Sequence, residues 1–388
     1  MPAEEKQPKG RAKWLRILCF VLLFAVVFLP IQELLRFKYR PDDCGALRYQ
    51  FYAEEPADSV DVVFISNSTF RTGICPMILY NEAGITSWNM SISYLQHTLC
   101  MEQLKTLLTL NTPPKFVVFS PNSLLHSRTS SREETEALYT QLIDDQPSFQ
   151  RKYEIYHTVR ETFGKDAVTP VSFLLPLLHH HSRWNQLDEV DWIPASYWPE
   201  HYESFLKGQS VDFDKYDVTL WVASEQWQDP NERFGDTITV LTEAAEGWTE
   251  FFTLCSQYDI TPVALIQPRF DSIFQGEALE CIVNWLDEQG VLTLNYMDET
   301  ALADLNMDYK HHFSDQLHIN FKGSIYFSQQ LAYALSDELG LEDHRGEEGF
   351  ESWDTDVTAF FDAYGSYITG ELGGSYAPWW DMEDDLSF

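Results

Sequence analysis

The hydrophobic pattern of the chain switches repeatedly between two periods after residue 58. Short apolar runs rich in β-branched residues are typical of strands buried on both faces of a parallel sheet, and apolar residues recurring every three or four positions predict helices. Strands are expected at residues 59–66, 87–89, 115–120, 262–267 and 291–296, and helices at residues 95–110, 237–258 and 277–289. This alternation predicts an α/β fold: a three-layer sandwich with a central parallel sheet and helical crossovers.

One apolar run near the N-terminus is of a different kind. Residues 17–31 are uncharged and are preceded by five basic residues. A membrane span needs about 17–25 residues, and residues 14–35 supply that length if Arg16 and Glu33 lie at the two interfaces. Residues 30–35 contain no small-x-small cleavage site, so an uncleaved signal anchor is favoured over a cleaved signal peptide.

The charges around this run predict its orientation. Five basic residues precede it and three follow it before residue 41, which favours a cytoplasmic N-terminus. We therefore expect a single-pass protein of the cell membrane, in which residues 1–40 form the cytoplasmic N-terminus and transmembrane anchor. Residues 41–339 are then an extracytoplasmic domain.

Two regions depart from the alternating pattern. Residues 124–236 form an aromatic and polar insertion after the third predicted strand, and residues 340–388 form a tail with 13 acidic residues, ten aromatic residues and a single basic residue, Arg345. That aromatic content is unusual for a disordered acidic tail. The tail is therefore expected to pack on the domain or on a partner.

Charge and cysteine content narrow the function. Beyond residue 40 the chain holds 18 Lys and Arg against 57 Asp and Glu, a surface that repels phosphate backbones and makes nucleic acid an unsuitable partner. None of the six cysteines forms a CxxC pair, so most are expected to be small core hydrophobes. The consecutive histidines 179–181 cannot all converge on one ion; we expect an exposed loop there, no metal and no cofactor.

A serine, a histidine and an aspartate occupy positions suited to acyl transfer. Ser68 follows the first predicted strand, and Asp315 stands three residues before His318 in the turn before a helix. A carboxylate so placed can bond one ring nitrogen and leave the other for a serine hydroxyl. The chain has no G-x-S-x-G elbow, P-loop or G-x-G-x-x-G, which excludes α/β-hydrolase, NTPase and dinucleotide-binding functions.

These residues resemble the SGNH, or GDSL-like, hydrolase superfamily, in which a serine follows the first strand and D-x-x-H precedes the last helix. The resemblance covers roughly residues 58–340 and is closer to a bacterial membrane-anchored branch, related to teichoic-acid D-alanyl transfer and polysaccharide O-acetylation proteins. It implies a flavodoxin-like sheet, with Ser68 as nucleophile, His318 as general base and Asp315 as the group that orients the imidazole.

The resemblance also implies an oxyanion hole built from Ser68, Ser91 and Asn122. Ser66 and Ser91 stand where this family has glycine. Serine keeps the backbone N–H but adds bulk and disfavours positive φ. The sequence is therefore compatible with a working catalytic site and with a site that has lost its activity.

A further element, His181-Ser-Arg183-Trp184, resembles an H-x-R-W sequence that recurs in the anchored branch. The resemblance implies that His181, Arg183 and Trp184 bind a sugar hydroxyl or an anionic group of the substrate. The alternative is structural: Trp184 fills the core of the insertion and Arg183 caps a helix.

Together these features predict an extracytoplasmic serine O-acyltransferase or esterase that acts on a cell-envelope polysaccharide or related polymer. The implied partners are that polymer or an acyl donor, and a membrane-bound O-acyltransferase that exports the acyl group. The alternative is a catalytically silent SGNH-fold protein that binds or scaffolds a cell-envelope modification complex.

Overall fold

The protein is an α/β structure around one five-stranded parallel sheet. The computed structural model describes residues 9–35, 47–93, 97–125, 138–140, 142–187, 189–192, 204–215, 238–269, 276–297 and 304–372. The strands are β1 (Val62–Ile65), β2 (Ser87–Asn89), β3 (Phe116–Phe119), β4 (Thr261–Ile266) and β5 (Leu292–Asn295), all parallel and in the order β2-β1-β3-β4-β5. The strand order reverses between β1 and β3, because β2 lies beside β1 while β4 and β5 follow on the far side of β3.

The helices between and around these strands have the following bounds. They are α1 (Lys9–Leu35), α2 (Leu47–Glu54), α3 (Ser68–Gly73), α4 (Pro76–Ala83), α5 (His97–Leu107), η1 (Asn122–Leu124), α7 (Phe149–Thr162), α8 (Pro170–Leu174), α9 (Pro176–His180), η2 (His181–Asn185), α10 (Glu189–Trp192), η4 (Ser204–Leu206), α13 (Thr242–Gln257), α14 (Gly276–Glu288), α16 (Tyr309–His312), α17 (Phe321–Leu339) and α18 (Glu351–Leu372). The five predicted strands and three predicted helices are all present, with ends shifted by a few residues.

One helix begins later than its pattern predicts. A helix was expected from residue 237, but residues 238–241 are not helical and α13 starts at Thr242. The backbone N–H of Leu241 donates to the carbonyl of Leu124 (2.8 Å), so the chain is bonded to η1 at this point. Periodicity alone cannot detect such a tertiary contact.

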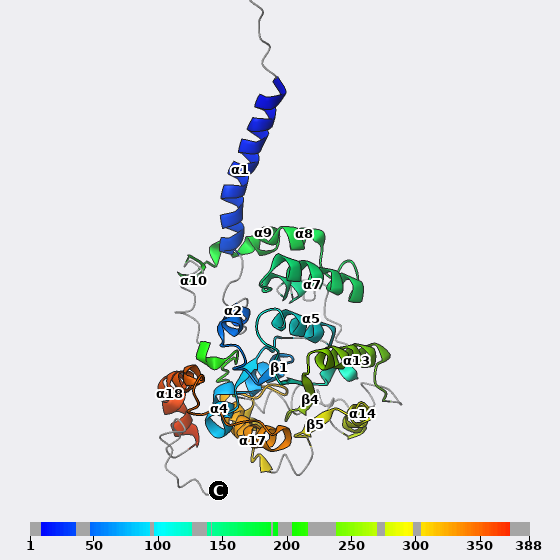
Figure 1. Ribbon diagram of the computed structural model, residues 1–388, viewed down its shortest axis with the longest axis vertical. Helices are drawn as coiled ribbons and strands as arrows, with labels where there is room; N and C mark the ends of the chain where they lie inside the picture. Colours follow the sequence, from blue (N-terminus) through cyan, green and yellow to red (C-terminus); the bar gives the residue numbers. More distant parts are fainter. Residues whose placement is uncertain are drawn as a thin grey trace, which may run out of the picture.

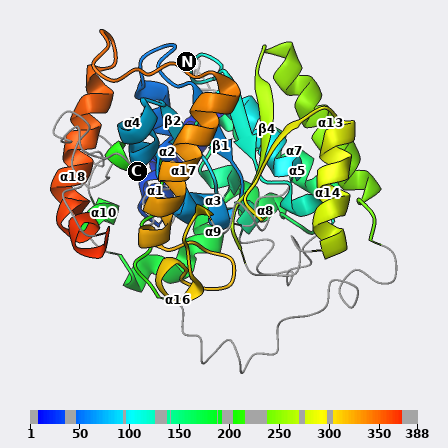
Figure 2. The ribbon, with the colours of Figure 1, turned by 90° about the horizontal axis from the view of Figure 1, so that it is seen from below.

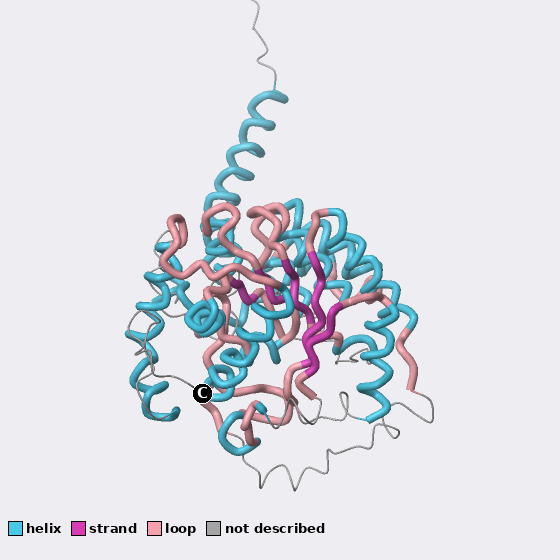
Figure 3. Tube along the Cα trace, turned by 60° about the horizontal axis from the view of Figure 1, so that its bottom comes forward, coloured by secondary structure: helices cyan, strands magenta, loops and turns pink. Residues whose placement is uncertain are grey.

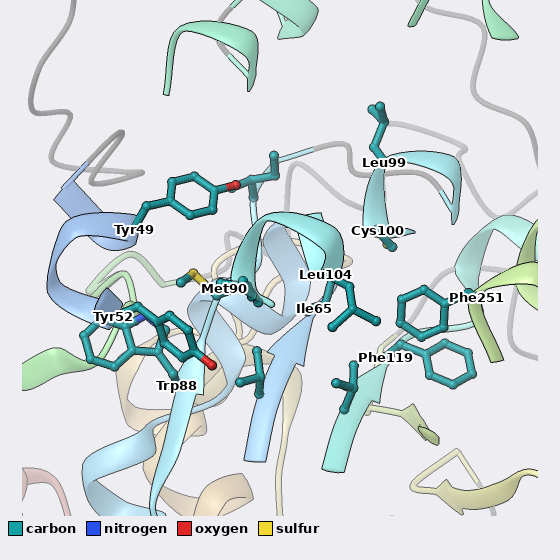
Figure 4. Packing of buried hydrophobic residues seen from close by; sticks show 14 of the residues in the cluster. Tyr49, Tyr52, Ile65, Trp88, Met90, Leu99, Cys100, Leu104, Phe119 and Phe251 are labelled. Carbon is teal, nitrogen blue, oxygen red and sulfur yellow. The ribbon is translucent and has the colours of Figure 1, made fainter. Parts of the chain in front are cut away.

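Alternating strand residues bury both faces of the sheet. Ile65 on β1 belongs to a cluster with Leu104 of α5 and Phe251 of α13 (Figure 4). Its neighbour Phe64 points to the opposite face and packs with residues of α3, α4 and α17, among them Phe70. Helices therefore cover the sheet on both sides, which gives three layers (Figures 2 and 3).

Helix α1 projects away from this domain (Figure 1). The 20 residues Lys13–Gln32 form the apolar part, and none of it is buried inside the protein. Because an α-helix rises 1.5 Å per residue, this segment is about 30 Å long, the thickness of the hydrocarbon core of a bilayer. The helix is therefore long and apolar enough to cross a membrane.

The insertion contributes a layer of short helices below α1. Helices α7, α8 and α9 lie between α1 and the sheet (Figure 1). The predicted exposed loop at residues 179–181 is wrong, because these residues end α9 and begin η2. His180 is buried and its Nε2 lies 3.1 Å from Oδ2 of Asp144, a partner far away in the sequence that the histidine run could not reveal.

The acidic tail packs on the domain over residues 351–372, and the remainder of the predicted tail segment after residue 372 lies outside the described residues. Helix α18 buries Trp353, Val357 and Phe360. It packs against α4 and η4, and the ring of Phe360 lies 6.3 Å from that of Phe321, the first residue of α17. Helix α18 therefore packs on the domain, which is the first of the two arrangements expected for the tail.

Three cysteines are buried core residues, Cys75, Cys100 and Cys255. Burial raises the pKa of the Cys75 thiol to about 12, so it stays protonated and unreactive. Cys281 is partly buried, and Cys44 lies outside the described residues.

Candidate active site

Ser68 lies at the turn from β1 into α3. The strand ends at Ile65, and Asn67 caps the helix by accepting a hydrogen bond from the backbone N–H of Thr69 at 3.0 Å. Asparagine is a favoured residue at this position. Ser68 is therefore the first residue of α3, beside the point between β1 and β3 where the strand order reverses and where ligands bind in parallel sheets.

Three side chains form a continuous hydrogen-bonded chain at this point. The hydroxyl Oγ of Ser68 lies 2.7 Å from Nε2 of His318, and Nδ1 of His318 lies 2.7 Å from Oδ2 of Asp315. The pattern fits a neutral imidazole that donates from Nδ1 to the carboxylate and accepts the serine proton at Nε2. The His318 side chain is 23% exposed, so a substrate can reach it.

Asp315 is held by backbone donors as well as by the ring. Its Oδ1 accepts from the N–H groups of Leu317 (2.7 Å) and His318 (2.8 Å). Burial on its own raises the pKa of the Asp315 carboxyl, but the hydrogen bond and charge of His318 and these two backbone donors outweigh it and hold the pKa below its usual range. Asp315 is thus a carboxylate at neutral pH.

The turn that carries Asp315 and His318 is fixed by the start of α17. Asn320 caps this helix, accepting from Gly323 N–H (3.0 Å) and donating from Nδ2 to the carbonyls of His311 (3.0 Å) and Asp214 (3.1 Å). A Cβ on Gly323 would lie 2.2 Å from the carbonyl oxygen of His312. Glycine is therefore required for the first turn of α17 to pack this closely on α16.

Ser66 and Ser91, which replace the glycines of the resembled family, contact each other. Ser91 Oγ accepts the backbone N–H of Ser66 (3.1 Å), and among the described residues neither serine has a positive φ. The two serines therefore introduce no backbone strain. The N–H of Ser91 donates to Oδ1 of Asn89 (3.2 Å), and Asn89 also donates from Nδ2 to the carbonyl of Phe70 on α3 (2.8 Å).

Asn122 begins η1, just after β3, and is oriented by an arginine from the neighbouring strand. Arg269, three residues beyond the end of β4, donates from Nη1 to Oδ1 of Asn122 (2.8 Å) and is 4% exposed. A bond to the oxygen fixes the orientation of the amide and gives Nδ2 the donor role. An oxyanion-stabilising asparagine acts through such an amide N–H donor.

The H-x-R-W residues are placed at the base of α1, apart from the turn that carries His318. Arg183 is buried; it donates to the carbonyl of Leu35 (2.8 Å) and to both carboxylate oxygens of Asp191 (2.9 Å). Trp184 is 71% exposed, so it does not fill the core of the insertion. Nδ1 of the exposed His181 lies 2.7 Å from the carbonyl of Leu178.

Sequence reasoning missed two residues that orient site groups, Asn89 and Arg269. Both follow or end a parallel strand, as Ser68 and Asn122 do, so their position at the carboxyl edge of the sheet was a signal that could have found them. Comparison with models of known protein families finds no match for this chain, and comparison with curated proteins finds no relative.

Proposed function

We propose that the protein is a membrane-anchored, extracytoplasmic serine O-acyltransferase or esterase of the SGNH type, acting on a cell-envelope polysaccharide or related polymer. The observation that carries this proposal is the chain of two 2.7 Å hydrogen bonds from Ser68 through His318 to Asp315. The strand order β2-β1-β3-β4-β5 supports it, since this is the flavodoxin-like order.

The proposed reaction uses each group of the chain in turn. Ser68 Oγ attacks the acyl carbonyl of the donor while its proton passes to Nε2 of His318, and the imidazolium returns that proton to the leaving oxygen. The acyl group is then an ester on Ser68. A polymer hydroxyl, or water, gives its proton to His318 and attacks this ester. His318 then returns that proton to Oγ of Ser68 as the ester bond breaks, which releases the product and restores the serine hydroxyl.

Neighbouring groups of the site stabilise the charges that develop during this reaction. The ionised Asp315 stabilises the imidazolium. Asn122 and the N–H of Ser68 face the carbonyl oxygen as it becomes negative. We further propose that a membrane-bound O-acyltransferase supplies the acyl group and that α1 holds the domain at the membrane.

A fluorophosphonate probe tests the chemistry directly, because it reacts only with an activated serine. Wild-type protein is expected to be labelled and Ser68→Ala is not. Ser182→Ala, which removes an exposed serine of η2, is the control and should label like wild type. Equal labelling of wild type and Ser68→Ala contradicts the proposal.

One observation favours the silent alternative. The Ser91 N–H, expected in the oxyanion hole, donates to Asn89 instead, which leaves the hole with two donors, Ser68 and Asn122. A protein that only binds or scaffolds needs no oxyanion-hole donors. If Ser68→Ala fully restores function in a deletion strain, the protein acts by binding and not by catalysis.

A further inference from the structure

Large apolar side chains are exposed on the short helices around the base of α1. We call these five residues the basal face: Val171 and Leu174 of α8, Leu178 of α9, Trp184 of η2 and Trp192 of α10. Each is between 51% and 71% exposed. Single exposed apolar residues are ordinary, but a group of them on adjoining elements marks a surface that contacts another phase or partner.

The domain contacts the end of α1 directly. Leu35 is only 7% exposed whereas Ile31, one turn earlier, is 42% exposed. Arg183 binds the carbonyl of Leu35 (2.8 Å), and Gln32 accepts the N–H of Leu177 (3.5 Å). The apolar segment of α1 therefore ends within one turn of the surface of the domain.

This junction fixes the level of a bilayer relative to the domain. If residues 13–32 span the hydrocarbon core, the interface of the bilayer lies at the depth of Gln32 to Leu35. Helix α9, η2 and α10 contact α1 at this depth, and α8 adjoins α9 (Figure 1). The basal face is therefore continuous with the lipid-exposed surface of α1.

The amino-acid composition around the basal face also favours contact with lipid. The chain holds 60 acidic residues, yet none lies between Ala167 and Leu187. The charge of Arg183 is paired with Asp191. Tryptophan and leucine favour the membrane interface, and α8, α9 and η2 carry no acidic residue that anionic headgroups would repel. Of the two acidic residues of α10, Glu189 and Asp191, the second is paired with Arg183.

We propose that α8, α9, η2 and α10 rest in the interfacial layer of the bilayer, with the basal face in contact with lipid. This proposal rests on the anchoring role of α1. It turns a single-helix anchor into a two-part attachment, in which the helix holds the domain at the membrane and the basal face fixes its tilt. Arg183, which binds both Leu35 and Asp191, joins the two parts.

The test measures lipid contact in the full chain, using single cysteines labelled with an environment-sensitive fluorophore in nanodiscs. The background carries Cys19→Ala, Cys44→Ala and Cys281→Ala, and the three buried cysteines stay unlabelled. Labels are placed by Leu178→Cys in the basal face and by Tyr333→Cys on α17, which is equally exposed at 50%. A third protein that keeps Cys19 reports on α1. The nanodiscs contain phosphatidylcholine, phosphatidylglycerol and a lipid with a nitroxide near its headgroup.

The labels at 178 and at Cys19 are expected to be strongly quenched by the nitroxide lipid, and the label at 333 is not. Quenching at Cys19 with none at 178 overturns the proposal and leaves the anchor intact. Absence of quenching at both overturns the proposal together with the anchor. A second protein covering the basal face is not present in these nanodiscs, so it cannot produce the expected result.

Two control measurements accompany the quenching experiment. Thermal unfolding of Leu178→Cys should match that of the background, because the side chain is exposed. Fluorophosphonate labelling of Ser68 in the same samples reports on the proposed chemistry separately, so its failure is distinguishable from failure of the lipid contact.

Discussion

Ser68 and His318 are separated by 250 residues in the sequence, yet Oγ of one lies 2.7 Å from Nε2 of the other. The two come together because α3 begins directly after β1 and α17 packs against α3 and α4. Strands β2 to β5 lie between them in the sequence. The candidate site therefore exists only when the complete α/β core has formed.

Asp315→Asn should fold and lose about 10⁴-fold in turnover, because an amide stabilises the wrong ring tautomer. His318→Ala should lose a similar factor. The double variant should be hardly slower than either single one, since groups that act as a unit give non-additive losses. The rates are measured on any ester that the wild type hydrolyses.

The chain supplies a matched control in a second D-x-x-H. Asp308 and His311 have the same spacing, and Nδ1 of His311 lies 2.9 Å from Oδ1 of Asp308. Asparagine also caps helices well, so Asp308→Asn should preserve α16 and the activity. Near-wild-type turnover of Asp315→Asn would mean that Asp315 does not orient His318.

The lowered pKa of Asp315 predicts how its contribution to stability depends on pH. A carboxyl whose pKa is lower in the folded state stabilises the fold above its unfolded pKa of about 4 and loses this effect as pH falls through the folded value. Wild type should therefore melt at a higher temperature than Asp315→Asn at pH 7. The difference should narrow as pH falls below about 4, measured by thermal unfolding at a series of pH values; a difference that does not change with pH contradicts the assignment.

The prediction for the oxyanion hole concerns Asn122 and the arginine that orients it. Removing one oxyanion donor costs about 10²–10³-fold in kcat, so Asn122→Ala should show a loss of that size with little change in KM. Arg269→Met leaves the amide in place but removes its bond at Oδ1. Its loss of kcat should be smaller, and adding it to Asn122→Ala should cost nothing further. Unfolding curves exclude a general loss of structure.

The α/β fold could be predicted from the sequence because most residues of its inner strands are buried on both faces. Residues such as Phe64 and Val118 are 0% exposed on the inner strands, so both faces select apolar residues and the runs stand out in the pattern. The second D-x-x-H shows what the sequence alone cannot predict. Asp308/His311 and Asp315/His318 differ in which ring faces Ser68, and that depends on how α16 and α17 pack.

The short helices of the insertion could not be predicted, for a related reason. Of the two roles expected for Arg183, substrate ligand or helix cap, the structure shows a bond to a helix end, the carbonyl of Leu35 at the end of α1, but that helix lies 148 residues away in the sequence. Polar residues buried by tertiary contacts carry no periodic signal. The exposed loop predicted at the histidine run was wrong for the same reason, because His180 is held by Asp144, a tertiary partner.

The last prediction concerns Lys207, which joins the insertion to the tail helix. It is 2% exposed and bonds Glu55 (2.5 Å) and Asp356 (2.6 Å), and its Nζ lies 4.4 Å from the centre of the Trp353 ring. Lys207→Met keeps the length of the side chain and leaves two carboxylates without this partner. Removing one member of a buried ion pair costs about 3–5 kcal/mol, and the free energy of unfolding should fall by about that amount in urea titrations.

The pH dependence of this loss separates charge from packing. Burial raises the pKa of the Glu55 carboxyl even beside Lys207, so in Lys207→Met it should protonate more readily as pH falls. The loss in unfolding free energy is therefore expected to be larger at pH 7 than at pH 5. Lys165→Met, which changes an exposed lysine, should leave stability within about 0.5 kcal/mol of wild type. A loss that is the same at both pH values would show that the stem of Lys207, packed on Trp353, matters more than its charge.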